Sequence, residues 1–487
     1  AGVPVGLFQL CLGKGSKVGS YLTSNNEIAG VAFTGSNEVA KQIKKSLIDC
    51  GNIEARLIAE TGGLNAMVVD STALCEQVTR DVIDSAFKSA GQRCSALRIL
   101  MIQEDCYEEV VSMIKGAMKE IGCGNPKYLD IECGPVINSA AQIKLQSYID
   151  KARHNNQIIE ELDIKSKIGF FVSPTLIRLE SMDDIHEEFF GPILHVLSYK
   201  DDELEKTIDQ LNSKGFGLTF GIHSRIEKKV KNISLKVNAG NVYINRNQIG
   251  AVVGSQPFGG EGLSGTGPKA GGPNSLHGYS QNMLCSEISN QKILFSDAHE
   301  DFQELLVPTL QLSNELLLEM KSKLTNIEEG FFEFLYQEVL KYSFDISLPG
   351  PTGESNQLRF KPKGTVLCLG PRPDELLKQI VLSLFLGNSV ICQISKEDYD
   401  SLISFGFKKE NIHRLNDSPS FSLLESNSYN AVFYFGNSSS LQEIILTSRR
   451  ELIPIISSIY ESWELLKEQV VTEDTTASGG NANLLAL

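Results

Sequence analysis

The chain has 487 residues, 41% of them hydrophobic, which is enough for about two to four domains with buried cores. Its formal net charge of −15 argues against binding to the phosphate backbone of a nucleic acid. No apolar run reaches the roughly twenty residues that a membrane-spanning helix needs, so we expect no such helix.

The ten cysteines and seven histidines are scattered through the chain. None of the cysteines forms a Cys-x-x-Cys pair or lies at metal-ligand spacing from a histidine, so we expect no metal site. No secretory signal precedes them, which favours a reducing cytoplasm; a longer parent could lie peripherally at the inner membrane. The opening AGVPVGLFQL lacks an initiator methionine, and we interpret the chain as part of a longer protein.

In chain order, the first 122 residues alternate short apolar strands with amphipathic helices. The strands are expected at 28–36, 54–63, 65–70 and 96–103. The helices are expected at 37–51, 73–91 and 106–122. This alternation predicts an α/β fold with a mostly parallel sheet. Further strands are predicted at 169–179, 193–200, 218–224 and 240–246.

Residues 250–273 are rich in glycine, and they allow two interpretations. A flexible linker is the simpler one. The glycines, however, are irregularly spaced and interrupted by Pro257 and Phe258, which favours an ordered loop that wraps around a ligand. Helical segments are expected at 289–342, and a second α/β run begins with a strand at 364–370.

The second α/β run echoes the first. Residues 430–445 parallel residues 29–43 in their pattern, and residues 477–485 parallel residues 61–69. Generic βαβ units can produce the same echo by coincidence, so the pattern alone leaves a true duplication open.

Three local features carry chemistry, and each has a plainer alternative. Residues 33–36 (FTGS) join a strand to a helix, so N–H groups at the helix start can face a phosphate, although a Ser-capped helix is the ordinary meaning. Glu60 ends a strand beside two glycines, where burial would make it a usable base; solvation is the alternative. Cys94 lies on a turn where Gly91 and Ser95 leave room for a substrate, against the default of a buried, inert thiol.

Four motifs in a fixed order make these features specific. VAFTGS, ETGGLNA, GQRCSA and EEFFGPI stand at residues 31–36, 60–66, 91–96 and 187–193. Together they resemble the aldehyde dehydrogenase superfamily, and the resemblance covers residues 1 to about 285. What it implies is an NAD-dependent oxidoreductase that works through a covalent intermediate.

The resemblance implies that Cys94, as thiolate, attacks an aldehyde carbon, that hydride passes to NAD⁺, and that a thioester remains. Glu60 would activate the water that hydrolyses it, while the backbone N–H of Cys94 and an asparagine hold the oxyanion. The matched cofactor positions are Gly35 and Ser36 at the pyrophosphate, Glu188 at the nicotinamide ribose, and Phe190 beside the ring. For Glu188, a surface acid at a helix end is the alternative.

The stretch 248–273 resembles the loop of L-glutamate γ-semialdehyde dehydrogenases, in particular those fused into bifunctional proline-utilisation enzymes. The resemblance implies that Gly250, Ala251 and Ser95 hold the α-carboxylate of the substrate, with Phe258 lining the pocket. Successive N–H groups in a glycine-permitted turn form an anion-binding concavity, and a serine hydroxyl adds a donor. The alternative is that Ser95 only caps or fills space.

The C-terminal residues resemble the extra domain of longer proline-utilisation enzymes, which is like an aldehyde dehydrogenase cofactor-binding half without function. No counterpart to Cys94 occurs there, and GPRPDE at 370–375 stands where an active member has Pro-Trp-Asn. We therefore expect a structural role, either covering the active site, sealing a passage for the intermediate or completing an oligomer interface.

The expected fold class is α/β, an aldehyde dehydrogenase-like fold with a partial Rossmann-type cofactor domain, an α/β catalytic domain and a second Rossmann-like α/β domain at the C-terminus. The expected divisions are the tail of an NAD-binding domain at 1–60, the catalytic domain at 61–247, the anchor loop and return segment at 248–288, a helical linker at 289–342 and the degenerate domain at 343–487.

The family's oxyanion asparagine and ribose-binding lysine belong to strands before Ala1, and FAD belongs to a proline dehydrogenase module that these residues lack. We expect the intact parent to oxidise L-glutamate γ-semialdehyde to L-glutamate, the second step of proline catabolism, and this chain alone to have little activity. The expected partners are the small-molecule substrate and further copies in a homo-oligomer. An aldehyde dehydrogenase for another substrate and a non-catalytic scaffold are the two alternatives.

Overall fold

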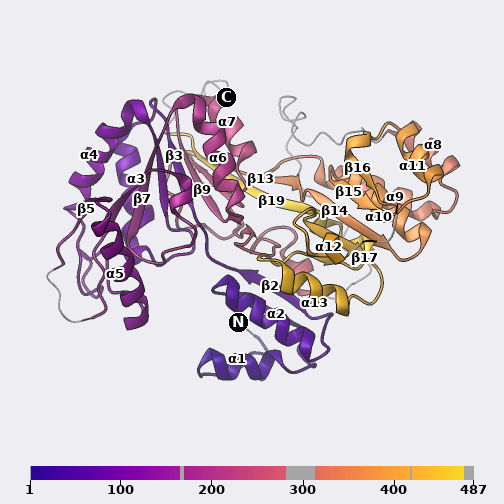
Figure 1. The fold of residues 1–487 in the computed structure, drawn as a ribbon, viewed down its shortest axis with the longest axis horizontal. Coiled ribbons are helices and arrows are strands. Elements are labelled where there is room, and N and C mark those ends of the chain that lie inside the picture. The colour runs from indigo at the N-terminus through magenta and orange to yellow at the C-terminus, as the bar shows by residue number, and fades with distance from the viewer. Residues whose placement is uncertain (1, 165–168, 281–312, 417–418, 420, 477–487) are drawn as a thin grey trace.

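The computed structural model describes residues 2–164, 169–280, 313–416, 419 and 421–476 (Figure 1). In these ranges the chain forms a small N-terminal unit, a ten-stranded sheet and a five-stranded sheet, with helices packed on both large sheets. The α/β class that the sequence predicts is confirmed.

The N-terminal unit holds the first of the predicted motifs. It consists of α1 (Gly15–Thr23), β1 (Gly30–Thr34), α2 (Asn37–Asp49) and β2 (Arg56–Glu60). The two strands pair in parallel, with Thr34 opposite Glu60. The unit also contacts the C-terminal part of the chain, because Asn37 donates from Nδ2 to the carbonyl of Arg450 at 2.9 Å.

The ten-stranded sheet is the core of the molecule. Its order is β12 (Ile346–Leu348), β13 (Glu354–Pro362), β19 (Leu466–Asp474), β10 (Asn241–Ile244), β9 (Thr219–His223), β3 (Ala66–Val69), β4 (Ile99–Gln103), β7 (Ile193–Tyr199), β6 (Thr175–Leu179) and β5 (Ile158–Glu161). Neighbours from β19 to β6 run parallel, and the outer pairs run antiparallel. Every residue of β3, β4, β9 and β10 is buried, as expected for parallel strands covered on both faces.

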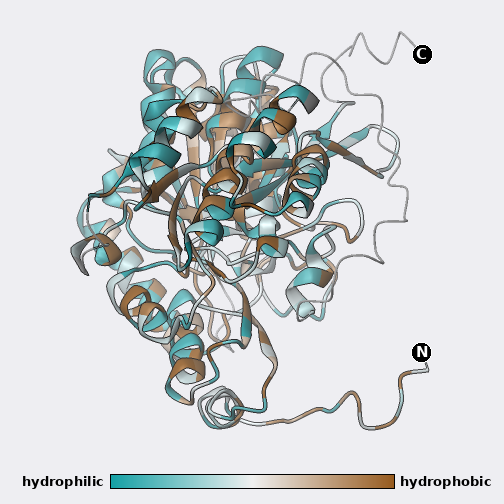
Figure 2. Cartoon of the chain, turned by 90° about the vertical axis from the view of Figure 1, so that its right-hand side faces the viewer, coloured by the Kyte–Doolittle hydropathy of each residue, from teal (hydrophilic) through white to brown (hydrophobic). Residues whose placement is uncertain are grey.

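Helices cover the two faces of this sheet, and alternate residues of the strands meet them. On β3, Met67 and Val69 belong to the apolar cluster of α3 (Cys75–Phe87) and α4 (Tyr107–Met118). Ala66 and Val68 belong to the cluster of α6 (Leu204–Ser213) and α7 (Glu227–Lys236). This division follows from the two-residue period of a strand. Hydrophobic residues accordingly lie on the strands and inner helix faces, and hydrophilic residues on the outer faces (Figure 2).

The five-stranded sheet lies in the C-terminal part. Its order is β16 (Ile412–Arg414), β15 (Ser389–Cys392), β14 (Thr365–Gly370), β17 (Ala431–Tyr434) and β18 (Ile455–Ile456), all parallel. The associated helices are α8 (Asn314–Lys323), α9 (Glu329–Tyr342), α10 (Pro373–Phe385), α11 (Lys396–Ser404), α12 (Phe421–Glu425) and α13 (Ser439–Ser448). The order reverses between β14 and β17, which is the Rossmann arrangement that the sequence predicts for this region.

Two long strands join the large sheets. β13 and β19 pair antiparallel from Glu354 opposite Asp474 to Pro362 opposite Leu466, and this pair crosses the centre of Figure 1. We call the two paired strands the C-terminal ribbon. β19 also pairs in parallel with β10. The C-terminal part of the chain therefore extends the ten-stranded sheet and also forms the five-stranded one. This pairing covers the edge of β10, whose backbone groups would otherwise lack partners.

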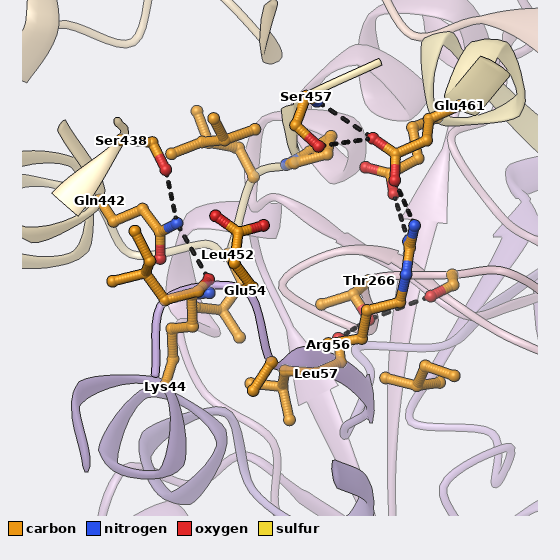
Figure 3. A pocket seen from close by; sticks show the side chains of 18 of the residues that line it. Lys44, Glu54, Arg56, Leu57, Thr266, Ser438, Gln442, Leu452, Ser457 and Glu461 are labelled. Carbon is orange, nitrogen blue, oxygen red and sulfur yellow. Dashed lines mark hydrogen bonds and ion pairs between the residues drawn. The ribbon is translucent and has the colours of Figure 1, made fainter. Parts of the chain in front are cut away.

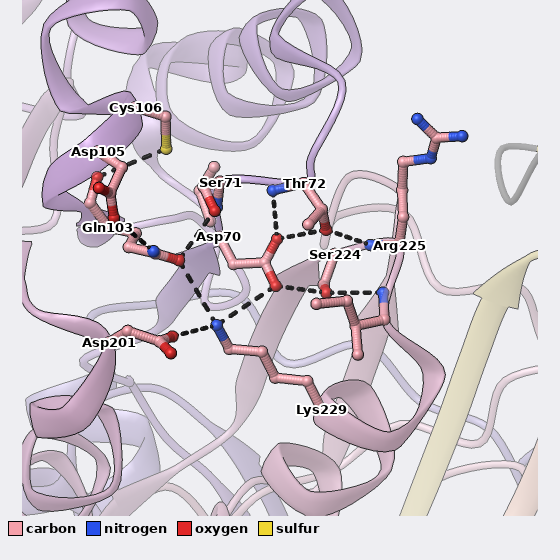
Figure 4. A network of polar contacts seen from close by, with 12 residues as sticks. Asp70, Ser71, Thr72, Gln103, Asp105, Cys106, Asp201, Ser224, Arg225 and Lys229 are labelled. Carbon is pink, nitrogen blue, oxygen red and sulfur yellow. Dashed lines mark hydrogen bonds and ion pairs between the residues drawn. The ribbon is translucent and has the colours of Figure 1, made fainter.

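A buried polar network secures the carboxyl ends of β3 and β9 (Figure 4). Asp70 accepts from the N–H and hydroxyl of Thr72 at 2.7 and 2.6 Å, and from the hydroxyl of Ser224 at 2.6 Å. The Lys229 ammonium of α7 lies 3.4 Å from Asp70 and 2.6 Å from Asp201. Because Lys229 of α7 pairs with both Asp70 and Asp201, the network is a structural clamp that fixes α7 to the sheet.

Most predicted elements of the first 122 residues occur, with ends moved by a few residues. Three helices not expected from the sequence are α5 (Ser139–His154), α6 and α7, which are largely polar with narrow apolar stripes. Residues 281–312 and the predicted echo at 477–485 lie outside the described residues. Every helix of the described ranges is too short or too polar to cross a bilayer. Clusters of three or more His, Cys, Asp or Glu residues fit to bind a metal do not occur in those ranges.

Candidate active site

Cys94 follows a turn with an unusual backbone. Ser89, Ala90 and Gly91 have φ angles of 58°, 54° and 63°, all in the left-handed region. A residue other than glycine in this region costs about 1–3 kcal/mol of conformational free energy. Contacts from the surrounding residues must therefore stabilise the turn. A Cβ atom on Gly91 would lie 2.2 Å from the carbonyl oxygen of Gly191, which explains the glycine at this position. The turn brings Cys94 to the amino edge of the parallel strands.

The buried side chain of Arg98 stabilises this turn through hydrogen bonds to its backbone. Its guanidinium donates to the carbonyls of Gly91 at 2.7 Å and Arg93 at 3.1 Å, and to Glu188 Oε1 at 3.0 Å. Only 1% of Arg98 is exposed. The Phe190 ring centre lies 5.2 Å from the guanidinium carbon. Arg98 thus connects the cysteine motif to the two predicted cofactor residues of the fourth motif.

Neutral polar side chains hold the backbone on either side of Cys94. Asn65, directly before β3, donates from Nδ2 to the carbonyls of Cys94 at 2.6 Å and Ala96 at 2.9 Å. Gln248 Nε2 and the Thr219 hydroxyl donate to the carbonyl of Ser95 at 3.3 and 3.2 Å. The side chain of Ser95 is buried. The position of the thiol is therefore set by contacts from β3, β9 and the start of the glycine-rich stretch.

The Cys94 thiol is half-buried and free. Burial raises its pKa above the ordinary 9.0, and the Glu60 and Glu188 carboxylates raise it further. Hydrogen bonds from the backbone N–H groups of Ser95 and Cys94 act in the opposite direction. Both acids therefore act on the sulfur electrostatically, and the thiolate forms more readily when a neighbouring carboxylate is neutral.

Glu60 ends β2 and is half-buried, with its Oε1 atom shielded from solvent. Its Oε2 accepts from the N–H of Gly260 at 3.0 Å, and Oε1 has no hydrogen-bond partner among the described residues. Burial raises the pKa of Glu60 well above 4.5, whereas the Gly260 hydrogen bond and the Lys269 charge lower it. A carboxyl group with a raised pKa and a free oxygen is suited to take a proton from water.

The predicted cofactor residues lie around the same strand end. The N–H of Gly35 donates to the Glu60 carbonyl at 3.1 Å, and the Ser36 side chain accepts from the N–H of Val39 at 3.3 Å as the cap of α2. Glu188 is mostly buried beside the two glycines of the ETGG motif, since a Cβ on Gly62 would lie 1.8 Å from its Oε2. The surface-acid alternative for Glu188 does not match this environment.

The glycine-rich stretch forms an ordered loop against these elements. Phe258 and Ala270 exchange backbone hydrogen bonds at 3.1 and 2.9 Å, and β11 (Glu261–Gly262) pairs with β8 (Phe216–Gly217). Gly250 has a φ of +76° and open space around its missing side chain, and Ala251 beside it is half-buried. No hydrogen bond joins these two residues to the Ser95 hydroxyl in the described ranges, so their shared role remains a prediction.

Five residues of this region are absent from the sequence predictions: Asn65, Arg98, Gln248, Lys269 and Glu468. Asn65 and Arg98 each stand directly before a fully buried strand. A polar residue at that position marks the amino edge of a parallel sheet, and this signal could have identified both. The partners of Lys269 and Glu468 lie up to 199 residues away, and no local pattern indicates them.

A cavity of about 470 Å³ lies elsewhere, between the N-terminal unit and the C-terminal sheet (Figure 3). Lys44, Arg56, Ser438 and Glu461 are among its lining residues, and Arg56 pairs with Glu461 across it. The cavity contains none of the predicted site residues, so it is separate from the cysteine site.

The chain is similar to several known proteins. Bifunctional protein PutA of Klebsiella aerogenes is 39% identical over 462 residues, covering 91% of this chain and 34% of that protein. A crystal structure of a Bradyrhizobium japonicum proline utilization A variant matches with 46% identity and a TM-score of 0.53, covering 54% of this chain and 27% of that one. A Thermus 1-pyrroline-5-carboxylate dehydrogenase with bound NAD matches with 32% identity and a TM-score of 0.52, covering 55% of this chain and 52% of that one.

The chain therefore spans about a third of the length of the PutA relatives that it matches. The profile of the aldehyde dehydrogenase family matches residues 1–284, which is more than half of the chain. That range contains all four sequence motifs and the cysteine site built from them. This chain belongs to the aldehyde dehydrogenase family.

Proposed function

We propose that the chain carries the catalytic centre of an NAD-dependent L-glutamate γ-semialdehyde dehydrogenase, the enzyme that completes proline catabolism. The observation that supports this most is the joining of the motifs by Arg98, which donates to the carbonyls of Gly91 and Arg93 just before Cys94 and also to Glu188. Glu188 in turn lies against Gly62, two residues after Glu60. A scaffold built from inactive parts would not need to keep a strained nucleophile turn, a buried base and a buried arginine in one place.

The residues of the chain support a two-step covalent reaction. Cys94, as thiolate, adds to the aldehyde carbon, and its backbone N–H would stabilise the oxyanion. Loss of hydride from that carbon leaves a thioester on Cys94. Glu60 then takes a proton from water as the water oxygen attacks the thioester, the carbon–sulfur bond breaks, and the carboxylate product leaves.

The donor set around Cys94 suits NAD. The carboxylate of Glu188 is of the right chemistry for ribose hydroxyls, and the turn at Gly35 and Ser36 places the amino end of α2 beside β2, where phosphate oxygens are stabilised. Phe190, 42% exposed, offers an apolar surface to a nicotinamide ring. NAD, when bound, supplies the acceptor for the hydride. FAD is proposed only for a proline dehydrogenase module of a longer parent.

The substrate proposal depends on the loop that begins at Gln248. Because Gln248 donates to the carbonyl of Ser95, the loop starts against the nucleophile turn. The positive φ at Gly250 allows successive N–H groups to face one anion, and Ser95 adds a hydroxyl donor. We assign Gly250, Ala251 and Ser95 to the α-carboxylate and Phe258 to the pocket wall.

We also propose the partners, the compartment and the oligomeric state of the enzyme. The site binds a small molecule, and the acidic chain is proposed to act in the cytoplasm without nucleic acid. A homo-oligomer is proposed for the parent, and the C-terminal domain is proposed to cover the active site or to complete the oligomer interface.

The test compares two aldehydes on the full-length natural protein that contains these residues. NADH formation is followed with L-glutamate γ-semialdehyde and with 4-aminobutanal, which lacks the α-carboxylate. We expect Gly250→Val to lower kcat/KM for the semialdehyde by about ten- to a hundredfold, the value of one or two charged hydrogen bonds, and to leave 4-aminobutanal unaffected.

Gly254→Val is the matched control, because Gly254 also has a positive φ of +86° and open space around it in the same loop. It should leave the preference for the carboxylate substrate unchanged. Equal rates of wild-type enzyme with both aldehydes, or equal effects of the two substitutions, would contradict the substrate assignment.

A further inference from the structure

Lys269 is a buried lysine in the glycine-rich stretch, only 3% exposed. Its ammonium donates to Asn241 Oδ1 at 2.9 Å and to the carbonyl of Gly259 at 2.5 Å. Placing an ammonium group in the interior is costly unless polar groups and charges compensate it. Packing alone therefore does not explain a lysine at this position.

A single peptide group connects this lysine to the catalytic base. The carbonyl of Gly259 accepts from Lys269 Nζ, and the N–H of the same peptide, at Gly260, donates to Glu60 Oε2 at 3.0 Å. Hydrogen bonds in series polarise one another, so the ammonium strengthens the N–H that the carboxylate receives. A Cβ on Gly259 would lie 2.8 Å from Glu60 Oε1, which shows how closely the peptide approaches the acid.

The C-terminal ribbon holds the lysine in turn. Glu468 of β19 accepts from the backbone N–H of Lys269 at 2.8 Å and from Asn274 Nδ2 at 3.0 Å. Glu468 is itself buried, at 7% exposed. The segment that carries Lys269 is thus fixed from β10, through Asn241, and from β19, through Glu468.

We propose that Lys269 is a positioning residue that stabilises the carboxylate form of Glu60 through the Gly259–Gly260 peptide, with Glu468 of the C-terminal ribbon fixing the lysine. The inference deepens the proposed function, since it rests on Glu60 as the base for thioester hydrolysis. It also gives β19 a part in the chemistry, although that strand lies about 400 residues beyond Glu60 in the chain.

The charges that act on Glu60 make the sign of the effect clear. Burial raises its pKa, Glu261 and Glu468 raise it further, and Lys269 is the cation that lowers it. Burial lowers the pKa of Lys269 itself, while Glu468, Glu60 and Glu261 favour its ammonium form. Loss of the ammonium leaves burial, Glu261 and Glu468 to raise the pKa of Glu60 against the Gly260 hydrogen bond, so Glu60 would keep its proton to higher pH.

The test measures the protonation of Glu60 without turnover. In infrared difference spectra of the full-length protein, the carboxyl band that disappears in Glu60→Gln is titrated against pH. We expect Lys269→Met to move its midpoint upward by about one unit or more, since a nearby opposite charge shifts a carboxyl by about one to three units. Lys269→Arg, which keeps a cation, should restore most of the wild-type midpoint.

Lys269→Gln provides a second variant, because its amide can still donate to the Gly259 carbonyl without a charge and is better tolerated in a buried polar site. An unchanged midpoint in both neutral variants, with circular dichroism showing a folded protein, would overturn the proposal. The function is tested separately: if Glu60→Gln still hydrolyses an acyl group from Cys94, Glu60 is not the base, whatever the infrared midpoints show.

Discussion

His195 is a buried side chain of the sheet whose pKa is shifted by its surroundings. It lies on β7 with no exposed surface; Nδ1 is 2.9 Å from the carbonyl of Arg98, and Nε2 is 2.9 Å from the Tyr148 hydroxyl. The neutral ring satisfies both contacts by donating to the carbonyl and accepting from the hydroxyl. Burial lowers the pKa of His195 to about 4 from the ordinary 6.5.

This environment predicts a loss of stability in mild acid. The unfolded chain takes up a proton at His195 below about pH 6.5, whereas the folded chain does so only near pH 4, so unfolding becomes easier as the pH falls between these values. Over the whole interval the free energy of unfolding falls by about 3 kcal/mol. It is measured as the difference in free energy of urea unfolding between about pH 7 and pH 4.5.

The variant His195→Gln should show a smaller loss over this interval than the wild type. His154→Gln is the control, because His154 is an exposed residue at the end of α5. If His195→Gln and the wild type lose equal free energy, the neutral buried ring is not a source of the acid sensitivity.

At this scale the sequence indicates the proposed reacting groups more readily than the residues that contact them. Cys94 and Glu60 stand in short motifs with recognisable neighbours, so they can be predicted from the letters alone. Arg98 donates to Glu188, 90 residues away, and Lys269 meets Glu468 across 199 residues. Such partners are determined by the tertiary fold, and a single sequence does not contain the pairing.

Among the elements, the ribbon of β13 and β19 affects the site through the glycine-rich loop. Glu354, the first residue of β13, pairs with Arg246 and accepts from Gln256 Nε2 at 2.9 Å. Arg246 precedes the loop and Gln256 lies within it, so one carboxylate holds both sides of residues 248–255. A hydrogen bond to a charged group contributes about 1.5–3 kcal/mol, and its loss favours local opening.

We therefore expect Glu354→Ala to speed amide hydrogen exchange in peptides covering residues 248–258 by about tenfold or more. Peptides of β3 and β4 should exchange as in the wild type, because those strands are anchored elsewhere. Glu410→Ala, at an exposed acid of the C-terminal part, is the control. Equal exchange of the loop in the two variants would show that Glu354 does not order it.

Elements with strong local signals can be predicted from the sequence. The apolar runs of β3 and β4, and the Ser-capped amphipathic α2, carry their own periodicity. The addition of β19 to β10 cannot be predicted in the same way, since Asn241 pairs with Val470 across more than two hundred residues. The narrow apolar stripes of α5 and α7 are diluted by charged residues and give weak patterns.

On the scale of the whole molecule, the site combines four parts of the chain. Glu60 comes from the N-terminal unit, Cys94 from the start of the catalytic sheet, Gly260 and Lys269 from the glycine-rich stretch, and Glu468 from the C-terminal ribbon. The order of the motifs is enough to predict the family, because each is short and local. The contact of Glu468 with the backbone of Lys269 appears only when the sheet is assembled.

The central claim is that Cys94 forms a thioester that Glu60 helps to hydrolyse. Acetylation by p-nitrophenyl acetate tests it without a cofactor, because the ester transfers its acyl group to a reactive thiol. After mixing, the fraction of each cysteine that carries an acetyl group is measured by peptide mass spectrometry. We predict that Glu60→Gln accumulates acetyl-Cys94 while the wild type returns to the free thiol. Acetylation spread evenly over the other cysteines, or equal persistence of acetyl-Cys94 in both proteins, would contradict the account.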